Sequence, residues 1–151
     1  GDDFAMTVVT QDWHVDPGDH WSDEPNFETT WPVHCAANSS GAAIHASLVD
    51  QPWNLVIRKG QHEGAYSGFD GSGDDGTSLF DVLTSAGITS VAVVGFATDH
   101  CVKATALDAR RLGFDVEVIL DLCAGVDPMT TEEAVDTMTT AGVTMTESNL
   151  I

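Results

Sequence analysis

Residues 90–112 decide the fold, and they read SVAVVGFATDHCVKATALDARRL. The first six form an uninterrupted, largely apolar run, which is typical of a buried strand. From residue 99 onward apolar residues recur at helical spacing, at Val102, Ala106, Ala109 and Leu112. Gly113 then ends the helical pattern. A strand that passes directly into a helix predicts one repeat of a parallel α/β sheet.

The same alternation continues on both sides of this stretch. Further strands are expected at residues 5–10, 55–58, 116–120 and 143–146. Further helices are expected from residue 77 or 78 to 86, and from the capping box at 130–133 through 141. Because the strands are continuously apolar, both faces of their sheet should be covered. The expected fold is a three-layer α/β/α arrangement with a mostly parallel, doubly wound sheet in a single domain, 1–151.

Composition excludes several classes of protein. Twenty-four acidic against five basic residues give a formal charge of −19, which argues against nucleic acid or an anionic membrane surface as partner. The acidity has two readings, a solvated soluble surface or adaptation to high salt. No apolar run approaches the length of a membrane span. Three widely spaced cysteines favour a reduced, cytoplasmic protein over a disulfide scaffold. Nothing in the composition argues against a homo-oligomer.

A candidate metal site follows the first predicted strand. Asp12 and His14 are two positions apart, so in an extended chain both point the same way. His20 and His34 come from the loop that follows. One carboxylate and three imidazoles suit a divalent transition metal such as zinc, iron or manganese. The alternative is a set of unrelated loop histidines, although three of the chain's six lie within this short stretch.

Cys101 stands where the decisive strand passes into its helix. A cysteine in the first turn of a helix is close to backbone N–H groups and to the positive end of the helix dipole, which lower its pKa. Such a thiolate can act as a nucleophile, and the same N–H groups can stabilise an oxyanion. The alternative is a small residue that packs the helix on the sheet. Cys35 and Cys123 lack this context and are expected to be structural.

Lys59 is one of only two lysines, and it closes the predicted strand at 55–58. Its position places it at the carboxyl edge of the sheet, where Cys101 is also expected. A lysine beside a thiol stabilises the thiolate. Lys103 and two further histidines, His45 and His62, are expected to be solvated surface residues.

Four motifs together resemble the nicotinamidases, also called pyrazinamidases, of the isochorismatase-like cysteine hydrolases. They are Asp-x-His-x5-His at 12–20, Trp-Pro-x-His-Cys at 31–35, the stretch from Lys59 to Phe69, and Gly-Phe-Ala-Thr-Asp-His-Cys-Val at 95–102. The resemblance covers nearly the whole chain. Its metal-site residues indicate the nicotinamidase branch, because other members of the superfamily generally lack them.

The resemblance implies a role for each matching residue. Cys101 would attack the carboxamide of nicotinamide or pyrazinamide to form a thioester, with Lys59 as its charge partner. The backbone N–H groups of Ala97 and Cys101 would form the oxyanion hole, and a cis peptide would precede Ala97. The metal on Asp12, His14, His20 and His34 would hold the ring nitrogen. The substrate pocket would be lined by Trp31, Tyr66, Phe96 and His100.

The chain departs from the family at its start, which resembles the family's second strand. The first strand and helix, with the aspartate that serves as general base, are expected to be missing. Loss of one triad member typically costs several orders of magnitude in rate, so weak or absent turnover is expected. Two alternatives to a nicotinamidase in the salvage of the nicotinamide cofactor therefore stay open. One is another small-amide hydrolase of the superfamily, and the other is a catalytically weak metal-binding remnant.

Overall fold

The computed structural model describes residues 4–150, which group into two compact units. Unit 1 comprises residues 4–65 and 70–79, and unit 2 comprises residues 66–69 and 80–150. Every pairing between strands in either unit is parallel, and helices accompany the strands, which confirms the predicted α/β class. The single domain predicted from the sequence stays a prediction.

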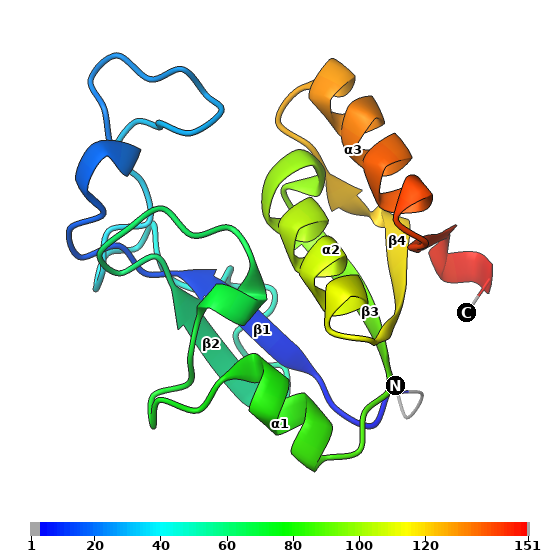
Figure 1. The fold of residues 1–151 in the computed structure, drawn as a ribbon. Coiled ribbons are helices and arrows are strands. Elements are labelled where there is room, and N and C mark those ends of the chain that lie inside the picture. The colour runs from blue at the N-terminus through cyan, green and yellow to red at the C-terminus, as the bar shows by residue number, and fades with distance from the viewer. Residues whose placement is uncertain (1–3, 151) are drawn as a thin grey trace. The chain divides into compact units, whose positions relative to one another are not determined.

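Unit 1 is built on two parallel strands and long loops. The strands, β1 (Val8–Asp12) and β2 (Leu55–Lys59), lie side by side (Figure 1). Their register pairs Asp12 with Lys59, so the last residue of each strand lies at the same edge. Ile57 is fully buried and supplies the core of this small sheet. Two short 3-10 turns, Gly18–His20 and Gly68–Asp70, interrupt the loops, and the second spans the boundary between the units.

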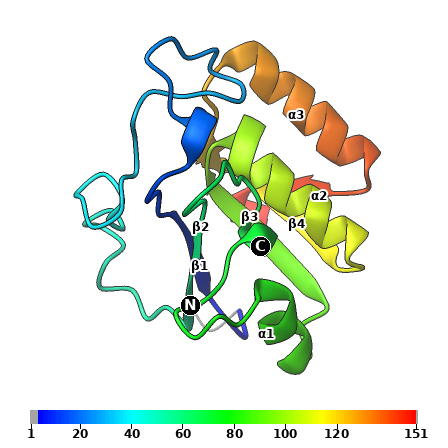
Figure 2. The same cartoon turned by 60° about the vertical axis from the view of Figure 1, so that its left-hand side comes forward.

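Unit 2 contains a three-stranded parallel sheet in the order β3-β4-β5. The strands are β3 (Ser90–Phe96), β4 (Asp115–Ala124) and β5 (Thr144–Thr146). The longer helices are α2 (Lys103–Arg111) and α3 (Pro128–Thr140), which lie together on one face of β3 and β4 (Figure 2). Helix α1 (Leu79–Ser85) precedes β3, and a 3-10 turn, Ser148–Leu150, follows β5.

The core of unit 2 lies between these helices and the sheet. Alanines face inward from the helices, so the helices can approach the strands closely. The most deeply buried apolar residues come from α2, β4 and α3: Ala106, Ala109, Val118, Ala134 and Met138. In the described part of the chain, no helix is long and apolar enough to cross a membrane.

Several boundaries differ from the sequence-based prediction, and two of the helix starts differ for clear physical reasons. The helix predicted from residue 99 begins instead with a π-helical turn, Thr98–Val102, followed by α2. Helix α3 begins at Pro128, two residues before the predicted capping box. The side chain of Asp127 caps it by accepting bonds from the N–H groups of Met129 and Thr130. Proline in the first position of a helix needs no hydrogen-bond acceptor, so an Asp-Pro pair is a stronger start than the capping box.

Candidate functional site

Three of the four predicted metal ligands come together in unit 1. One nitrogen of each of His14, His20 and His34 lies within 4.8 Å of the others, and His14 and His20 are buried. His14 is fixed by the main chain, because its N–H donates to the carbonyl of Cys35 at 3.0 Å and its carbonyl accepts from Ala37 at 2.7 Å. Cys35 has a positive φ of 46°, a conformation that turns the loop toward His14.

Each ring in this three-histidine cluster is oriented by a carbonyl oxygen of the main chain. The Nδ1 atoms of His14, His20 and His34 lie 2.5, 3.2 and 2.7 Å from the carbonyl oxygens of Gly60, Thr29 and Pro32 respectively. A carbonyl oxygen only accepts, so each Nδ1 carries a hydrogen, and in a neutral ring the Nε2 atom then carries the lone pair. This is the arrangement that fixes the tautomer of histidine ligands in metal sites.

A cation between the three rings would satisfy the lone pairs of the cluster. The Nε2 atoms of His14 and His34 are 3.2 Å apart, and two acceptors at that distance repel each other. Burial, followed by the nearby charges of His14 and His34, lowers the pKa of His20, which favours the neutral ring that a metal requires. The donor set therefore fits a divalent transition metal with nitrogen ligands.

Asp12, the fourth predicted ligand, forms an ion pair with Lys59 and is not among the three residues of the cluster. Its Oδ1 accepts a hydrogen bond from the ammonium group of Lys59, the residue opposite it in the register of β1 and β2. Its charge still acts to raise the pKa of His20, against the larger effects that lower it. Lys59 is 2% exposed and also donates to the carbonyl of Ala65 at 3.1 Å. The role of Asp12 as a fourth ligand stays a prediction.

Two glycines that the sequence analysis did not single out make room for the histidine rings. A Cβ at Gly60 would lie 2.7 Å from His14 Cε1, and a Cβ at Gly64 would lie 2.7 Å from His20 Nδ1. Both distances are too short for a side chain. The only signal for these glycines in the sequence was their place in the Lys59–Phe69 motif. That motif indicates a family, but it does not show that the glycines lie against the rings of His14 and His20.

Replacing Gly64 by alanine is expected to weaken metal binding about tenfold, the effect typical of disturbing the support of a ligand. The new methyl group would displace the His20 ring and break its contact with the carbonyl of Thr29. Competition with a chromophoric zinc chelator measures the affinity. Gly41→Ala is the matched control, because its Cβ would meet only ordinary contacts at 3.5 and 3.7 Å. Equal affinities in the two variants would contradict the role of Gly64.

Trp31 lies beside the three-histidine cluster. Its ring centroid is 6.5 Å from that of His34 in an edge-on arrangement, and the backbone N–H of Trp31 donates to the carbonyl of His20 at 2.8 Å. Among the predicted pocket residues, Trp31 is the one that belongs to unit 1. Lys59 and the histidines belong to this unit as well, whereas Cys101 belongs to unit 2.

Cys101 lies in the π-helical turn of unit 2, immediately before α2. The carbonyl of Ala97 accepts from the N–H groups of His100 at 3.1 Å and Val102 at 3.0 Å, which closes the turn. The peptide bond between Phe96 and Ala97 is cis, as the resemblance implies. The thiol therefore occupies the start of a helical segment, the position from which the sequence predicts a nucleophile.

Three predicted pocket residues belong to the same unit as this turn. The rings of Tyr66 and His100 stack with centroids 5.6 Å apart and an angle of 29°. Phe96 ends β3 and is 81% exposed, so it does not pack in the core of unit 2. Stacked rings and exposed aromatic side chains can bind the flat face of a ring.

The other two cysteines differ from Cys101. Burial raises the pKa of the Cys123 thiol, and its sulfur donates to the carbonyl of Ile119 at 3.3 Å. A protonated thiol is a poor nucleophile. Cys35 contributes through its backbone, as described above. All three cysteines are free of disulfides.

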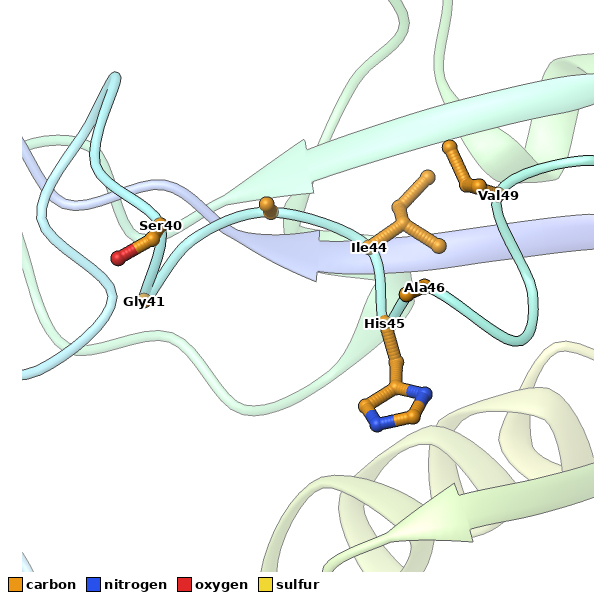
Figure 3. Close-up of a pocket in the computed structure, with 7 residues that line it drawn as sticks. Ser40, Gly41, Ile44, His45, Ala46 and Val49 are labelled. Carbon is orange, nitrogen blue, oxygen red and sulfur yellow. The ribbon is translucent and has the colours of Figure 1, made fainter.

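Unit 1 also contains a pocket of about 620 Å³ (Figure 3). The loop of residues 40–49 lines it, and it includes none of the predicted site residues. The imidazole of His45 points away from the side chains of Ile44 and Val49, and its Nδ1 is 2.8 Å from the hydroxyl oxygen of Ser47. His45 is exposed, as predicted.

Comparisons with known proteins agree on one family. Residues 3–149 match the model of the isochorismatase domain. The nicotinamidase/pyrazinamidase of Mycobacterium tuberculosis is 46% identical over 141 residues, which cover 93% of this chain and 76% of that protein.

Two solved structures are similar as well. PnC1 from L. infantum in complex with nicotinate gives a TM-score of 0.83 at 39% identity, over 97% of this chain and 73% of that one. The pyrazinamidase of Pyrococcus horikoshii in complex with zinc gives a TM-score of 0.76 at 35% identity. The match covers 95% of this chain and 75% of that one.

Proposed function

Since the chain belongs to the isochorismatase family, we propose that it hydrolyses nicotinamide to nicotinate and ammonia. The observation that carries the proposal is the three-histidine cluster of unit 1, whose nitrogen atoms converge within 4.8 Å. A relative of 46% identity is a nicotinamidase/pyrazinamidase, and a similar structure contains nicotinate. The reaction would serve the salvage of the nicotinamide cofactor. The free cysteines fit the proposed cytoplasmic location.

Cys101 is the proposed nucleophile. Its sulfur attacks the carboxamide carbon, the carbon–nitrogen bond breaks, and the thiol proton leaves with the nitrogen as ammonia. Water then attacks the thioester, which releases the carboxylic acid and restores the thiol. No oxidant or reductant is needed, because both steps are acyl transfers.

The other residues of the proposed mechanism act on charge and orientation. The backbone N–H groups of Ala97 and Cys101 stabilise the oxyanion that forms in each step. Lys59 has the role of charge partner to the thiolate that the family resemblance implies. The aromatic rings of Trp31, Tyr66 and His100, with that of Phe96, bind the face of the substrate ring.

The proposed metal is held by His14, His20 and His34, with Asp12 as the fourth ligand that the resemblance implies. Zinc is the first candidate, since a similar pyrazinamidase structure contains it. When bound, a divalent metal supplies a Lewis acid that holds the pyridine nitrogen of the substrate. The histidines orient that metal through their bonds to the main chain.

The experiment that tests the proposal compares nicotinamide with benzamide, which has the same carboxamide but no ring nitrogen. The zinc-loaded protein is expected to release ammonia and nicotinate in equal amounts from nicotinamide, at the low rate expected of a triad without its general base. Its kcat/KM for benzamide is expected to be about 100-fold or more lower, because the ligand for the metal is missing. Equal rates would favour another small-amide hydrolase of the family. Zinc binding without any turnover would favour the metal-binding remnant.

A further inference from the structure

Asp99 is a buried carboxylate in unit 2 that the proposed mechanism does not use. The residue is 1% exposed, and both of its oxygens accept hydrogen bonds. Oδ1 accepts from the N–H of Val126 at 3.0 Å, and Oδ2 accepts from the N–H of Asp127 at 3.2 Å and from the hydroxyl of Thr130 at 2.6 Å. Every one of these donors belongs to the start of α3 or to the loop before it.

The parallel sheet explains why these segments meet. The register pairs Phe96 of β3 with Ala124 of β4, so the two strands end at the same edge. The π-helical turn follows the first strand, and the loop into α3 follows the second. Asp99 therefore connects two segments that are 27 to 31 residues apart in the sequence.

The hydrogen bonds keep this buried carboxylate ionised. Burial is the largest single influence and raises the pKa of Asp99, but the hydroxyl of Thr130 and the N–H groups of Val126 and Asp127 together outweigh it. The resulting pKa lies below the ordinary value for aspartate. His100 Nε2 is 3.9 Å from Oδ2 and adds a further polar neighbour. A buried charge with several donors is strongly tied to its surroundings.

The turn that Asp99 stabilises is an unusual one. Val102 donates to Ala97, five residues back, which is the spacing of a π-helix. Such turns are rare and occur mainly at functional sites. Cys101 lies within this turn, two residues after Asp99, so its position depends on how firmly the turn is held.

We propose that Asp99 and Thr130 form a latch that holds the π-helical turn and thereby positions the thiol of Cys101. The proposal rests on the proposed role of Cys101 as nucleophile. Both members of the latch are positioning residues, since their described contacts connect the turn to α3. The N-terminus of α3 thus becomes part of the support for the reacting group, although it contributes no reacting atom.

Thr130→Val tests the latch, because it removes the hydroxyl and leaves the charge of Asp99 in place. Loosening the turn weakens the stabilisation of the thiolate by helix N–H groups, so the pKa of Cys101 should rise. Alkylation of Cys101 by iodoacetamide at pH 6.5 is expected to slow about tenfold, which is one pKa unit. Mass spectrometry of the Cys101 and Cys123 peptides across pH gives the profile. Thr130→Ser keeps the hydroxyl and is expected to restore the wild-type profile.

Asp99→Asn separates positioning from a direct effect of charge. Removing a negative charge near a thiol would by itself lower the thiol pKa and speed alkylation. The latch predicts the opposite, because the amide cannot accept at both of its ends. Faster alkylation in Asp99→Asn would overturn the proposal, and so would a Thr130→Val profile identical to that of the wild type.

Asp121→Asn is the matched control. Asp121 accepts hydrogen bonds from the N–H and hydroxyl of Ser148, but both residues are exposed. Its replacement is expected to leave the Cys101 profile unchanged, and an equal slowing there would contradict the latch. Wild-type Cys101 that reacts no faster than Cys123 would contradict both the nucleophile and the latch. Fast wild-type alkylation that Thr130→Val leaves unchanged would contradict the latch alone.

Discussion

Replacing Cys101 by alanine is expected to lower the release of ammonia from nicotinamide by roughly 10⁴-fold or more. The variant loses the sulfur that forms the thioester, and neither of the other cysteines can replace it. Burial raises the pKa of the Cys123 thiol, and Cys35 lies in a loop rather than at the start of a helical segment. The measurement is ammonia release by the zinc-loaded protein under conditions in which the wild type turns over.

Zinc content is the internal control for this variant. The three histidines belong to unit 1 and Cys101 to unit 2, so Cys101→Ala is expected to bind as much zinc as the wild type. Cys123→Ala is the matched cysteine variant and should retain most of the activity. Full activity in Cys101→Ala would rule out the proposed thioester chemistry.

Replacing His34 by alanine is expected to weaken zinc binding more than about 100-fold. Loss of a group that only orients a ligand typically costs up to about that much, and loss of the ligand itself should cost more. His34 is the least buried of the three histidines, so its removal disturbs the fold least. Its Nε2 lies 3.2 Å from that of His14, and its loss removes one of the four proposed ligands of the metal. Elemental analysis after dialysis against a weak chelator measures the bound metal.

Turnover and a control complete this experiment. Nicotinamide hydrolysis is expected to fall together with zinc content, and excess zinc should restore part of it. His45→Ala is the control, because this exposed histidine contacts Ser47 and lies outside the cluster. Unchanged zinc affinity in His34→Ala would show that the three histidines do not form the site.

The strands and the change from strand to helix before Cys101 could be predicted because their signals are local. The apolar run at residues 90–95 becomes β3, and the residues after it contain the predicted change from strand to helix. The spacing of Asp12 and His14 likewise predicted a metal site where three histidines converge. These features depend on side-chain order over a few positions, which periodicity shows directly.

The remaining features depend on contacts between distant segments. The pairing of Asp12 with Lys59 follows from the register of β1 and β2, which hydrophobic pattern alone does not give. A π-helical turn has nearly the same apolar spacing as an α-helix. The sequence pattern therefore did not show that the helical segment begins with a π-helical turn at residue 98. The sequence offers two possible starts for α3, the capping box at Thr130 and the pair Asp127-Pro128, and the structure uses the second. The hydroxyl of Thr130 donates to Asp99 instead of capping the helix.

The carbonyl oxygens that orient the three histidine rings have a consequence for how the site tolerates sequence change. Substitution of a side chain at position 29 or 32 cannot delete a carbonyl, so the tautomers of His20 and His34 survive most point mutations there. Gly60 differs, because a Cβ at that position would clash with the ring of His14. In sites where a carboxylate side chain orients the histidine, a single replacement removes that support. The weak points here are the positions that hold the loops in shape, above all the two glycines beneath the rings. Divergent relatives could thus exchange many loop residues while they keep the same coordination chemistry.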